Sequence, residues 1–231
     1  MRSLLERILY HQKIEGIKLS LIRKDALLIY SGGQTRLKSN SSLSESTSYS
    51  NVANSLNLYQ VIYDQLLEER QLDRHQRFRI HEFLTDRVTT EEFALDSWTN
   101  LVFSVARFKE FTGHYPHHIT VIGHSFKSKR FQEIHREALR WPSEKFEYVS
   151  IQDDSNQLES RYLGEKEVFQ SFGFDRYGCL GKLMSKRISR NPFRRFHSYL
   201  ISNYELTGLL EWCPANGIDW YPGPLPWSNL T

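Results

Sequence analysis

Three polar segments of the chain combine residue types that can bind an anion or move a proton. The first follows the apolar run 26–30. Its paired glycines let the backbone turn sharply and bring N–H groups close to a ligand, and its arginine can add a bidentate contact. It is neither a Walker loop nor a G-x-G-x-x-G fingerprint, so a plain turn and an anion-binding loop both remain open. The residues are Ser31, Gly32, Gly33, Gln34 and Arg36.

The second segment is an acidic block with a four-residue spacing. Glu92, Asp96 and Asn100 share one stripe if the segment is helical, with Ser97 beside them. If the helix begins at Ser97, Glu92 instead lies at the edge of the sheet. In both arrangements the two carboxylates can act as an acid/base pair or hold a polar ligand group. The competing interpretation is a helix cap, made either by Thr89 with Glu92 or by Asp96, beside a solvated face.

The third segment, residues 123–130, comes directly off an apolar run. His124 is placed to transfer protons near neutral pH at the carboxyl edge of a sheet. Ser125 lacks the final glycine of a G-x-S-x-G elbow, which disfavours a serine hydrolase. Lys127 and Arg130 fall in the first turn of the next helix, where they form either an anion site or an exposed basic turn.

Two further clusters have ordinary explanations that we prefer. His114, His117 and His118 precede a strand, and so lie at the edge of the sheet away from the expected site; we interpret them as a surface loop. No Cys/His spacing resembles a zinc site, so we assign no metal, and the sequence does not identify a cofactor. The second cluster can bind the phosphates of a nucleic acid, but we favour a polar helix face. This set comprises Lys182, Lys186, Arg187, Arg190, Arg194 and Arg195.

The elements that must position these groups follow from hydrophobic periodicity and breakers. Apolar runs at 26–30, 119–122 and 146–151 predict strands, the first two leading into a polar loop and a helix. Strand–loop–helix units indicate an α/β fold with a parallel sheet whose loops gather at the carboxyl edge, where ligands bind. Helices are expected over 3–18, from about Ser44 to 67, after Thr89 or Asp96 to 112, and over 126–139 and 165–190.

Composition limits the class of protein. With 231 residues, the chain suits one large domain or one domain with appendages, and its net charge of +3 is too balanced for wholesale nucleic-acid binding. No segment is apolar enough to span a membrane, and the first helix is a poor signal peptide. We therefore expect a cytoplasmic protein in which Cys179 and Cys213 are ordinary thiols.

The chain resembles the YdcF-like family, the domain of unknown function numbered 218, in its fungal branch. The likeness runs in order from residue 25 to about 192. It rests on Ser31–Arg36, Ser44–Tyr49, Glu91–Asn100, Tyr115-Pro116, Ile119–Phe131, Trp141-Pro142, Lys186-Arg187 and Arg190–Pro192.

The resemblance implies a Rossmann-like three-layer α/β sandwich over residues 1–192, with residues 193–231 as an aromatic-rich extension. Family motif positions fall on Gly32, Gly33, Glu45, Glu92, Asp96, Ser97, Asn100, His124 and Arg130. The resemblance also implies an opening strand and polar loop, whereas here Met1 lies only about 24 residues before the Gly-Gly strand. Thr99 stands where many relatives carry Glu. On this view the domain is truncated at its N-terminal end.

Our leading hypothesis joins the three segments into one pocket at the carboxyl edge of the sheet for a small anionic or nucleotide-like ligand, with an adenosyl compound as one candidate. His124 with Glu92 or Asp96 would transfer protons, and Gly33 N–H, Arg36 and Arg130 would hold the anion. The alternatives are a non-catalytic interaction protein that receives a strand from a partner, and nucleic-acid binding through residues 182–195.

Overall fold

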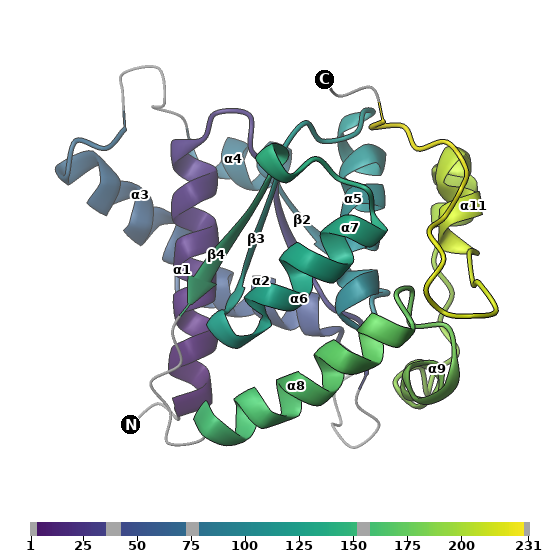
Figure 1. The fold of residues 1–231 in the computed structure, drawn as a ribbon. Coiled ribbons are helices and arrows are strands. Elements are labelled where there is room, and N and C mark those ends of the chain that lie inside the picture. The colour runs from purple at the N-terminus through teal and green to yellow at the C-terminus, as the bar shows by residue number, and fades with distance from the viewer. Residues whose placement is uncertain (1–3, 36–42, 73–78, 152–157, 229–231) are drawn as a thin grey trace.

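The computed structural model describes residues 4–35, 43–72, 79–151 and 158–228 (Figure 1). The strands are short and the helices dominate. In chain order the principal elements are α1 (Leu4–Ile22), β1 (Leu28–Ser31), α2 (Glu45–Ser55), α3 (Leu58–Glu68), α4 (Ile80–Arg87), β2 (Val88–Glu91), α5 (Ser97–Thr112), β3 (Ile119–His124), α6 (Ser128–Arg130), α7 (Arg136–Ala138), β4 (Phe146–Ile151), α8 (Leu158–Phe174), α9 (Gly181–Ser189), α10 (Tyr199–Ser202) and α11 (Thr207–Leu210).

The strands form two separate parallel pairs. β1 pairs with β2 from Leu28 opposite Val88 to Ser31 opposite Glu91, and β3 pairs with β4 from Ile119 opposite Phe146. The prediction of an α/β fold with parallel strands is confirmed. Within the described residues the two pairs are not hydrogen-bonded into one sheet, so the continuous three-layer sandwich is not observed.

Helix α1 spans both strand pairs. A Cβ atom built on Gly16 would lie 3.2 Å from Leu28 Cδ1 of β1 and 3.6 Å from Ile122 Cδ1 of β3. Leu28 and Ile122 therefore both pack against the same turn of α1, which places β1 and β3 on the same side of this helix. Figure 1 likewise shows α1 lying along the strands.

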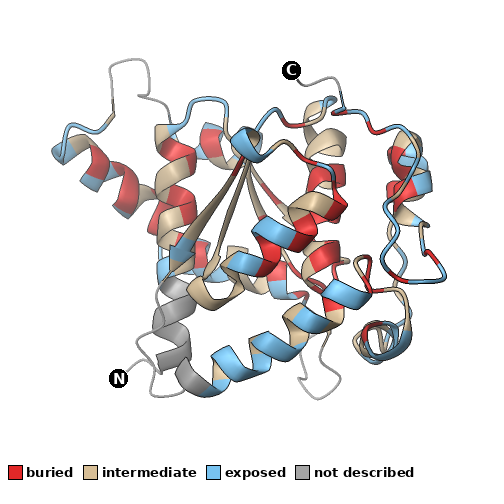
Figure 2. Ribbon diagram, viewed as in Figure 1, coloured by how far each residue is buried: buried red, intermediate tan, exposed pale blue. Residues whose placement is uncertain are grey.

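Two hydrophobic cores hold these layers. One contains Ile17, Leu21, Tyr59, Leu66 and Phe83, and packs α1, α3 and α4 around β1. The other surrounds α5 and the helical segment 128–138 (Figure 2). Its buried members include residues from the C-terminal segment: Tyr199, Leu206, Leu209, Leu225 and Trp227. The C-terminal segment therefore contributes to the main core, as well as covering the surface.

The capping residues decide where two helices begin. Ser44 caps α2 by accepting the Thr47 N–H at 3.1 Å, which confirms the expected start. The capping box proposed for Thr89 and Glu92 is wrong, because residues 88–91 form β2. Asp96 is the cap of α5: its carboxylate accepts the Thr99 N–H at 2.8 Å, and the Thr99 hydroxyl accepts the Asp96 N–H at 3.0 Å.

Two predicted helices are interrupted. Residues 125–138 form one irregular helical segment that contains a π-helical stretch over Phe131–His135. The helix expected over 165–190 divides into α8 and α9, because Asp175 accepts the N–H groups of Cys179 and Leu180 at 3.0 and 2.8 Å and holds a loop between them.

The prediction of two ordinary thiols is also wrong. Cys179 and Cys213 form a disulfide across 34 residues of sequence. It joins the loop between α8 and α9 to the segment after α11, two regions whose contact could not be read from spacing. Among the described residues, no helix is both long and apolar enough to cross a membrane.

Candidate functional site

The Gly32-Gly33 loop joins β1 to its neighbours by backbone hydrogen bonds. The Gly32 N–H donates to Glu91 O at 3.0 Å and the Gly33 N–H donates to Ala94 O at 2.8 Å. A Cβ atom on Gly33 would lie 2.5 Å from that same carbonyl oxygen, which explains the glycine. The expectation that these two N–H groups face an anion is therefore wrong. Gln34 is half-buried beyond them, and Arg36 lies outside the described residues.

Behind this loop, Glu91 forms a buried polar junction. It is fully buried and accepts the Phe93 N–H at 2.8 Å, the Ala94 N–H at 3.2 Å and the Tyr199 hydroxyl at 3.2 Å. Ser31 Oγ lies 2.9 Å from Glu91 and 2.8 Å from Asn100 Oδ1. Burial raises the pKa of Glu91, and the surrounding donors oppose that rise.

One hydroxyl proton cannot serve both acceptors of Ser31. The Ser31 hydroxyl therefore donates to either Glu91 or the Asn100 amide oxygen. This junction ties together β1, β2 and the first turn of α5. It places the predicted residues Ser31 and Asn100 in direct contact. Beside them lies Glu91, a carboxylate that the sequence analysis did not select.

Three arginines converge on successive residues at the N-terminus of α5. Arg187 Nε donates to the Asp96 carboxylate at 2.5 Å, and Arg190 Nη1 donates to the Leu95 carbonyl at 2.9 Å. Arg130 Nη1 donates to the Ser97 hydroxyl. Since α5 has 16 residues, its N-terminus also carries the positive end of a helix dipole. Positive charge is therefore concentrated at one point.

Two of these arginines are already paired with carboxylates. Arg130 is 5% exposed and grips Glu165 of α8 with two hydrogen bonds of 2.6 and 2.8 Å. Arg187 holds Asp96, as above. Arg130 is therefore a positioning residue that ties α6 to α8 and α5. Asp96, occupied by the helix cap and by Arg187, is poorly placed to transfer protons.

His135 completes this cluster from the π-helical stretch. Its Nε2 lies 2.8 Å from Ser97 Oγ, the same oxygen that accepts a hydrogen bond from Arg130. Its Nδ1 has no hydrogen-bond partner among the described atoms. Full burial, with help from Arg130 and Arg187, lowers the pKa of His135 well below its ordinary value.

Lys127 and Lys186 add charge without adding a carboxylate partner. Both side chains are half-buried, and neither forms an ion pair in the part of the chain that the structure describes. Burial lowers the pKa of each lysine, and the nearby charges of Arg130 and Arg190 lower it further. We call Lys127, Arg130, Lys186, Arg187 and Arg190 the basic cluster. Its five cations face three carboxylates: Asp96, Glu165 and Glu45.

Helix α9 and its C-cap explain how three of the five cluster members come together. Lys186, Arg187 and Arg190 share the face of Leu183, which is buried, whereas Met184 and its neighbours on the opposite face are exposed. The sequence alone could not tell which face of this cationic helix would turn inward. Lys186 and Arg190 therefore belong to the site, although the sequence analysis treated them as part of a polar surface.

Glu45 connects the basic cluster to the glycine loop. It begins α2, its side chain lies within 3.1 Å of the position that a Gly32 Cβ would occupy, and it accepts the Tyr49 hydroxyl. Its charge is close enough to raise the pKa of Lys127 in opposition to burial. The predicted residues Gly32 and Glu45 thus lie in the same neighbourhood as Lys127.

His124 and Ser125 lie at the carboxyl end of β3, as predicted. The His124 ring stacks on Phe126 with centroids 5.0 Å apart, and the His124 carbonyl accepts the Tyr148 hydroxyl at 2.8 Å. Ser125 opens the 3₁₀ turn that carries Lys127 toward the basic cluster.

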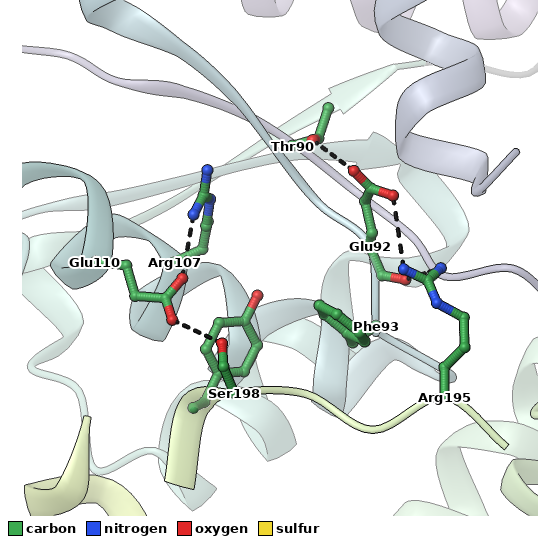
Figure 3. A pocket seen from close by; sticks show the side chains of 8 residues that line it. Thr90, Glu92, Phe93, Arg107, Glu110, Arg195 and Ser198 are labelled. Carbon is green, nitrogen blue, oxygen red and sulfur yellow. Dashed lines mark hydrogen bonds and ion pairs between the residues drawn. The ribbon is translucent and has the colours of Figure 1, made fainter. Parts of the chain in front are cut away.

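Glu92 is separate from these groups. It lines a cavity of about 230 Å³ with Arg107, Glu110, Arg195 and four further residues, none of which is among the other predicted site residues (Figure 3). Its carboxylate lies 3.7 Å from Arg195 Nη2 and accepts the Thr90 hydroxyl at 3.1 Å. The four-residue spacing with Asp96 failed as a guide because residues 92–96 are not helical.

The chain is similar to a protein of Saccharomyces cerevisiae described as "Uncharacterized protein YOR238W". The two are 33% identical over 211 residues, which cover 80% of this chain and 69% of the yeast protein. No profile of a protein family matches the chain, and no solved structure matches it. The description of the yeast protein states no activity, so function is argued from the geometry of the site.

Proposed function

The chain belongs to the family of the yeast protein YOR238W, and we propose that it binds a small phosphorylated, nucleotide-like molecule at the basic cluster. The observation that carries this proposal is the convergence of three arginines on residues 95–97, where two carboxylates are already consumed by Arg130 and Arg187. Lys127 and Lys186 form no direct ion pair among the described residues, and Glu45, Glu165 and Asp96 act on them only at longer range.

Electrostatics favours an anion at this place. Five cations near three carboxylates leave excess positive charge, and the helix N-terminus adds to it. Partial burial weakens screening by water and salt, so the attraction for a phosphate exceeds that of exposed lysines. The inward direction of Lys186, Arg187 and Arg190 also favours a small ligand over a nucleic acid, which would need these groups on the surface.

Binding is better supported than catalysis in this proposal. His124, at the end of β3, is the remaining predicted group for proton transfer. Asp96 is held by Arg187 and by its capping role, and Glu92 lines a different cavity. The arrangement therefore gives less support to the carboxylates as an acid/base pair than to Lys127 and Lys186 as phosphate ligands.

The test is a ligand screen on the full chain by thermal shift, with inorganic phosphate, nucleotides, adenosyl compounds and sugar phosphates. A ligand that raises the melting temperature should bind Lys127→Gln and Lys186→Gln about tenfold or more weakly, since each loses a charge-assisted contact. Lys182→Gln is the matched control, because Lys182 lies on the exposed face of α9. A ligand that stabilises all four proteins equally would place the site elsewhere.

The divided sheet favours a second candidate function, in which a partner chain supplies a strand. Parallel sheets are normally covered on both faces, yet every residue of β3 is only half-buried, including Val121 and Ile122. In this proposal β1–β2 and β3–β4 are two parts of one Rossmann-like sheet that a parallel strand between β1 and β3 would join. A soluble, monomeric preparation that melts cooperatively and shows slow amide exchange in β3 would count against it.

A further inference from the structure

The cavity of about 230 Å³ beside β2 is separate from the basic cluster and has its own charged walls (Figure 3). It lies between residues 90–93 at the end of β2, the C-terminal half of α5, and residues 195–199. Its volume is below that of pockets for drug-sized ligands, which suits a smaller molecule.

One wall is an ion pair on α5 whose polar groups are already engaged in hydrogen bonds. Arg107 Nη1 donates to Glu110 at 3.1 Å, and its Nε and Nη2 donate to Thr89 Oγ1 at 3.1 and 2.8 Å. Glu110 also accepts the hydroxyls of Ser198 at 3.0 Å and of Ser202. These hydrogen bonds fix the wall and leave it little capacity to hold a ligand tightly.

The other wall is an ion pair whose two charged groups are not hydrogen-bonded to each other. Arg195 Nη2 and Glu92 Oε2 are 3.7 Å apart, beyond hydrogen-bond distance, while Arg195 Nη1 is held by the Glu92 carbonyl at 3.2 Å. Thr90 donates to the other carboxylate oxygen, which orients Glu92. Arg195 and Glu92 thus offer a donor group and an acceptor atom of opposite charge at the wall of the cavity.

The floor between the walls is aromatic. The Arg195 guanidinium lies 4.7 Å from the centre of the Phe93 ring, which packs edge-on against Tyr199 at 6.1 Å. The Tyr199 hydroxyl is turned away to the buried Glu91. An apolar side chain can therefore rest on this floor while charged groups engage the loose ion pair.

We propose that this cavity binds a free α-amino acid as its zwitterion. The ammonium group donates to Glu92 and the carboxylate accepts from Arg195, so each charge of the ligand meets its opposite. A zwitterion satisfies both members of the Arg195–Glu92 pair, whereas a phosphate would face Glu92 and Glu110, and a simple amine would leave Arg195 unused. The proposal does not depend on the ligand of the basic cluster.

The experiment is thermal shift followed by calorimetry on the full chain, with each common amino acid at about 10 mM, a concentration that reveals dissociation constants in the millimolar range. At least one free amino acid should raise the melting temperature. Its N-acetyl and carboxamide derivatives should each bind at least about tenfold more weakly, because each loses one charged contact.

Variants locate the binding. Glu92→Gln and Arg195→Gln should lose affinity at least about tenfold, while Glu167→Gln and Lys182→Gln, from an exposed ion pair of similar length at 3.8 Å, should bind as the wild type does. The melting temperature without ligand verifies that each variant folds; if Arg195→Gln does not, Arg195→Lys keeps the charge and should retain binding. Absence of binding by every free amino acid, equal binding of the blocked derivatives, or wild-type affinity in Glu92→Gln would overturn the proposal.

Discussion

Replacing Arg130 by methionine should destabilise the protein more than any other single removal of charge in the basic cluster. The side chains of Arg130 and Glu165 are 6% and 10% exposed, and they share two hydrogen bonds. Methionine fills similar space but leaves the Glu165 carboxylate buried without its partner. Breaking a buried ion pair from one side costs about 3 to 5 kcal/mol. Lys127 is close enough to Glu165 to recover part of this loss.

The expected change is large enough for a simple assay. In a protein of this length each kcal/mol corresponds to a shift of about 2 to 4 °C in melting temperature, so Arg130→Met should melt roughly 6 to 20 °C below the wild type. Urea titrations followed by circular dichroism should report the same loss as a lower midpoint with an unchanged slope.

A double-mutant cycle separates the ion pair from packing. Arg130→Met with Glu165→Met should recover most of the loss, because two apolar side chains of suitable volume can replace a buried pair at little net cost. Lys182→Met, which opens an exposed pair with Glu167, should leave the melting temperature unchanged within error. An Arg130→Met protein within about 1 kcal/mol of the wild type would refute the argument that this pair is buried and coupled.

Three further predictions test other parts of the fold. Gly33→Ala should lose about 1 to 3 kcal/mol in denaturant titrations, because its Cβ meets a backbone oxygen at 2.5 Å; Gly164→Ala, in α8 with nothing within 4 Å, should gain about 0.5 to 1 kcal/mol, and equal effects would contradict the close approach. The lowered pKa of His135 means that stability is fully present above the unfolded value of about 6.5 and falls as the pH decreases below it, since only the unfolded state readily takes up the proton. His135→Gln should show a shallower fall in unfolding free energy between pH 7 and pH 5, and parallel curves would mean that another group is responsible. Reduction of the Cys179–Cys213 disulfide should lower the free energy of unfolding by about 3 to 4 kcal/mol, because the unfolded chain regains the entropy of a 34-residue loop. The melting temperature should therefore fall when reductant is added, while a variant with both cysteines replaced by serine should melt at the same temperature with and without reductant. Identical wild-type curves with and without reductant would show that the bond does not stabilise the fold.

Local signals in the sequence were sufficient for several elements. The apolar runs at Ile119–Ile122 and Phe146–Ile151 became β3 and β4, and the hydroxyl of Ser44 caps α2 as expected. These predictions succeeded because each depends on a short stretch of chain: the burial of consecutive apolar residues, or a side chain that satisfies its own helix terminus.

Predictions from neighbouring residues failed where the same residues suit either a helix cap or a strand. Val88–Glu91 has a threonine-rich, capping-like composition, and only pairing with β1 makes it a strand. The alternation of side chains along β2 turns Glu91 inward, and Glu92 follows the end of the strand and lines the cavity beside it. Asp96 instead caps α5, so the two carboxylates that the four-residue spacing seemed to pair lie apart.

The amino-acid sequence by itself determined the parallel α/β class, most of the helices and the three chemical segments, because periodicity and breakers are properties of neighbouring residues. Tertiary structure alone decided that α9 turns Lys186 and Arg190 inward, that Arg130 is committed to Glu165, and that Cys179 meets Cys213. Those outcomes depend on which distant surfaces pack together and on how buried charges find partners. The free energy of such contacts belongs to pairs of residues far apart in the chain, so no local pattern encodes it.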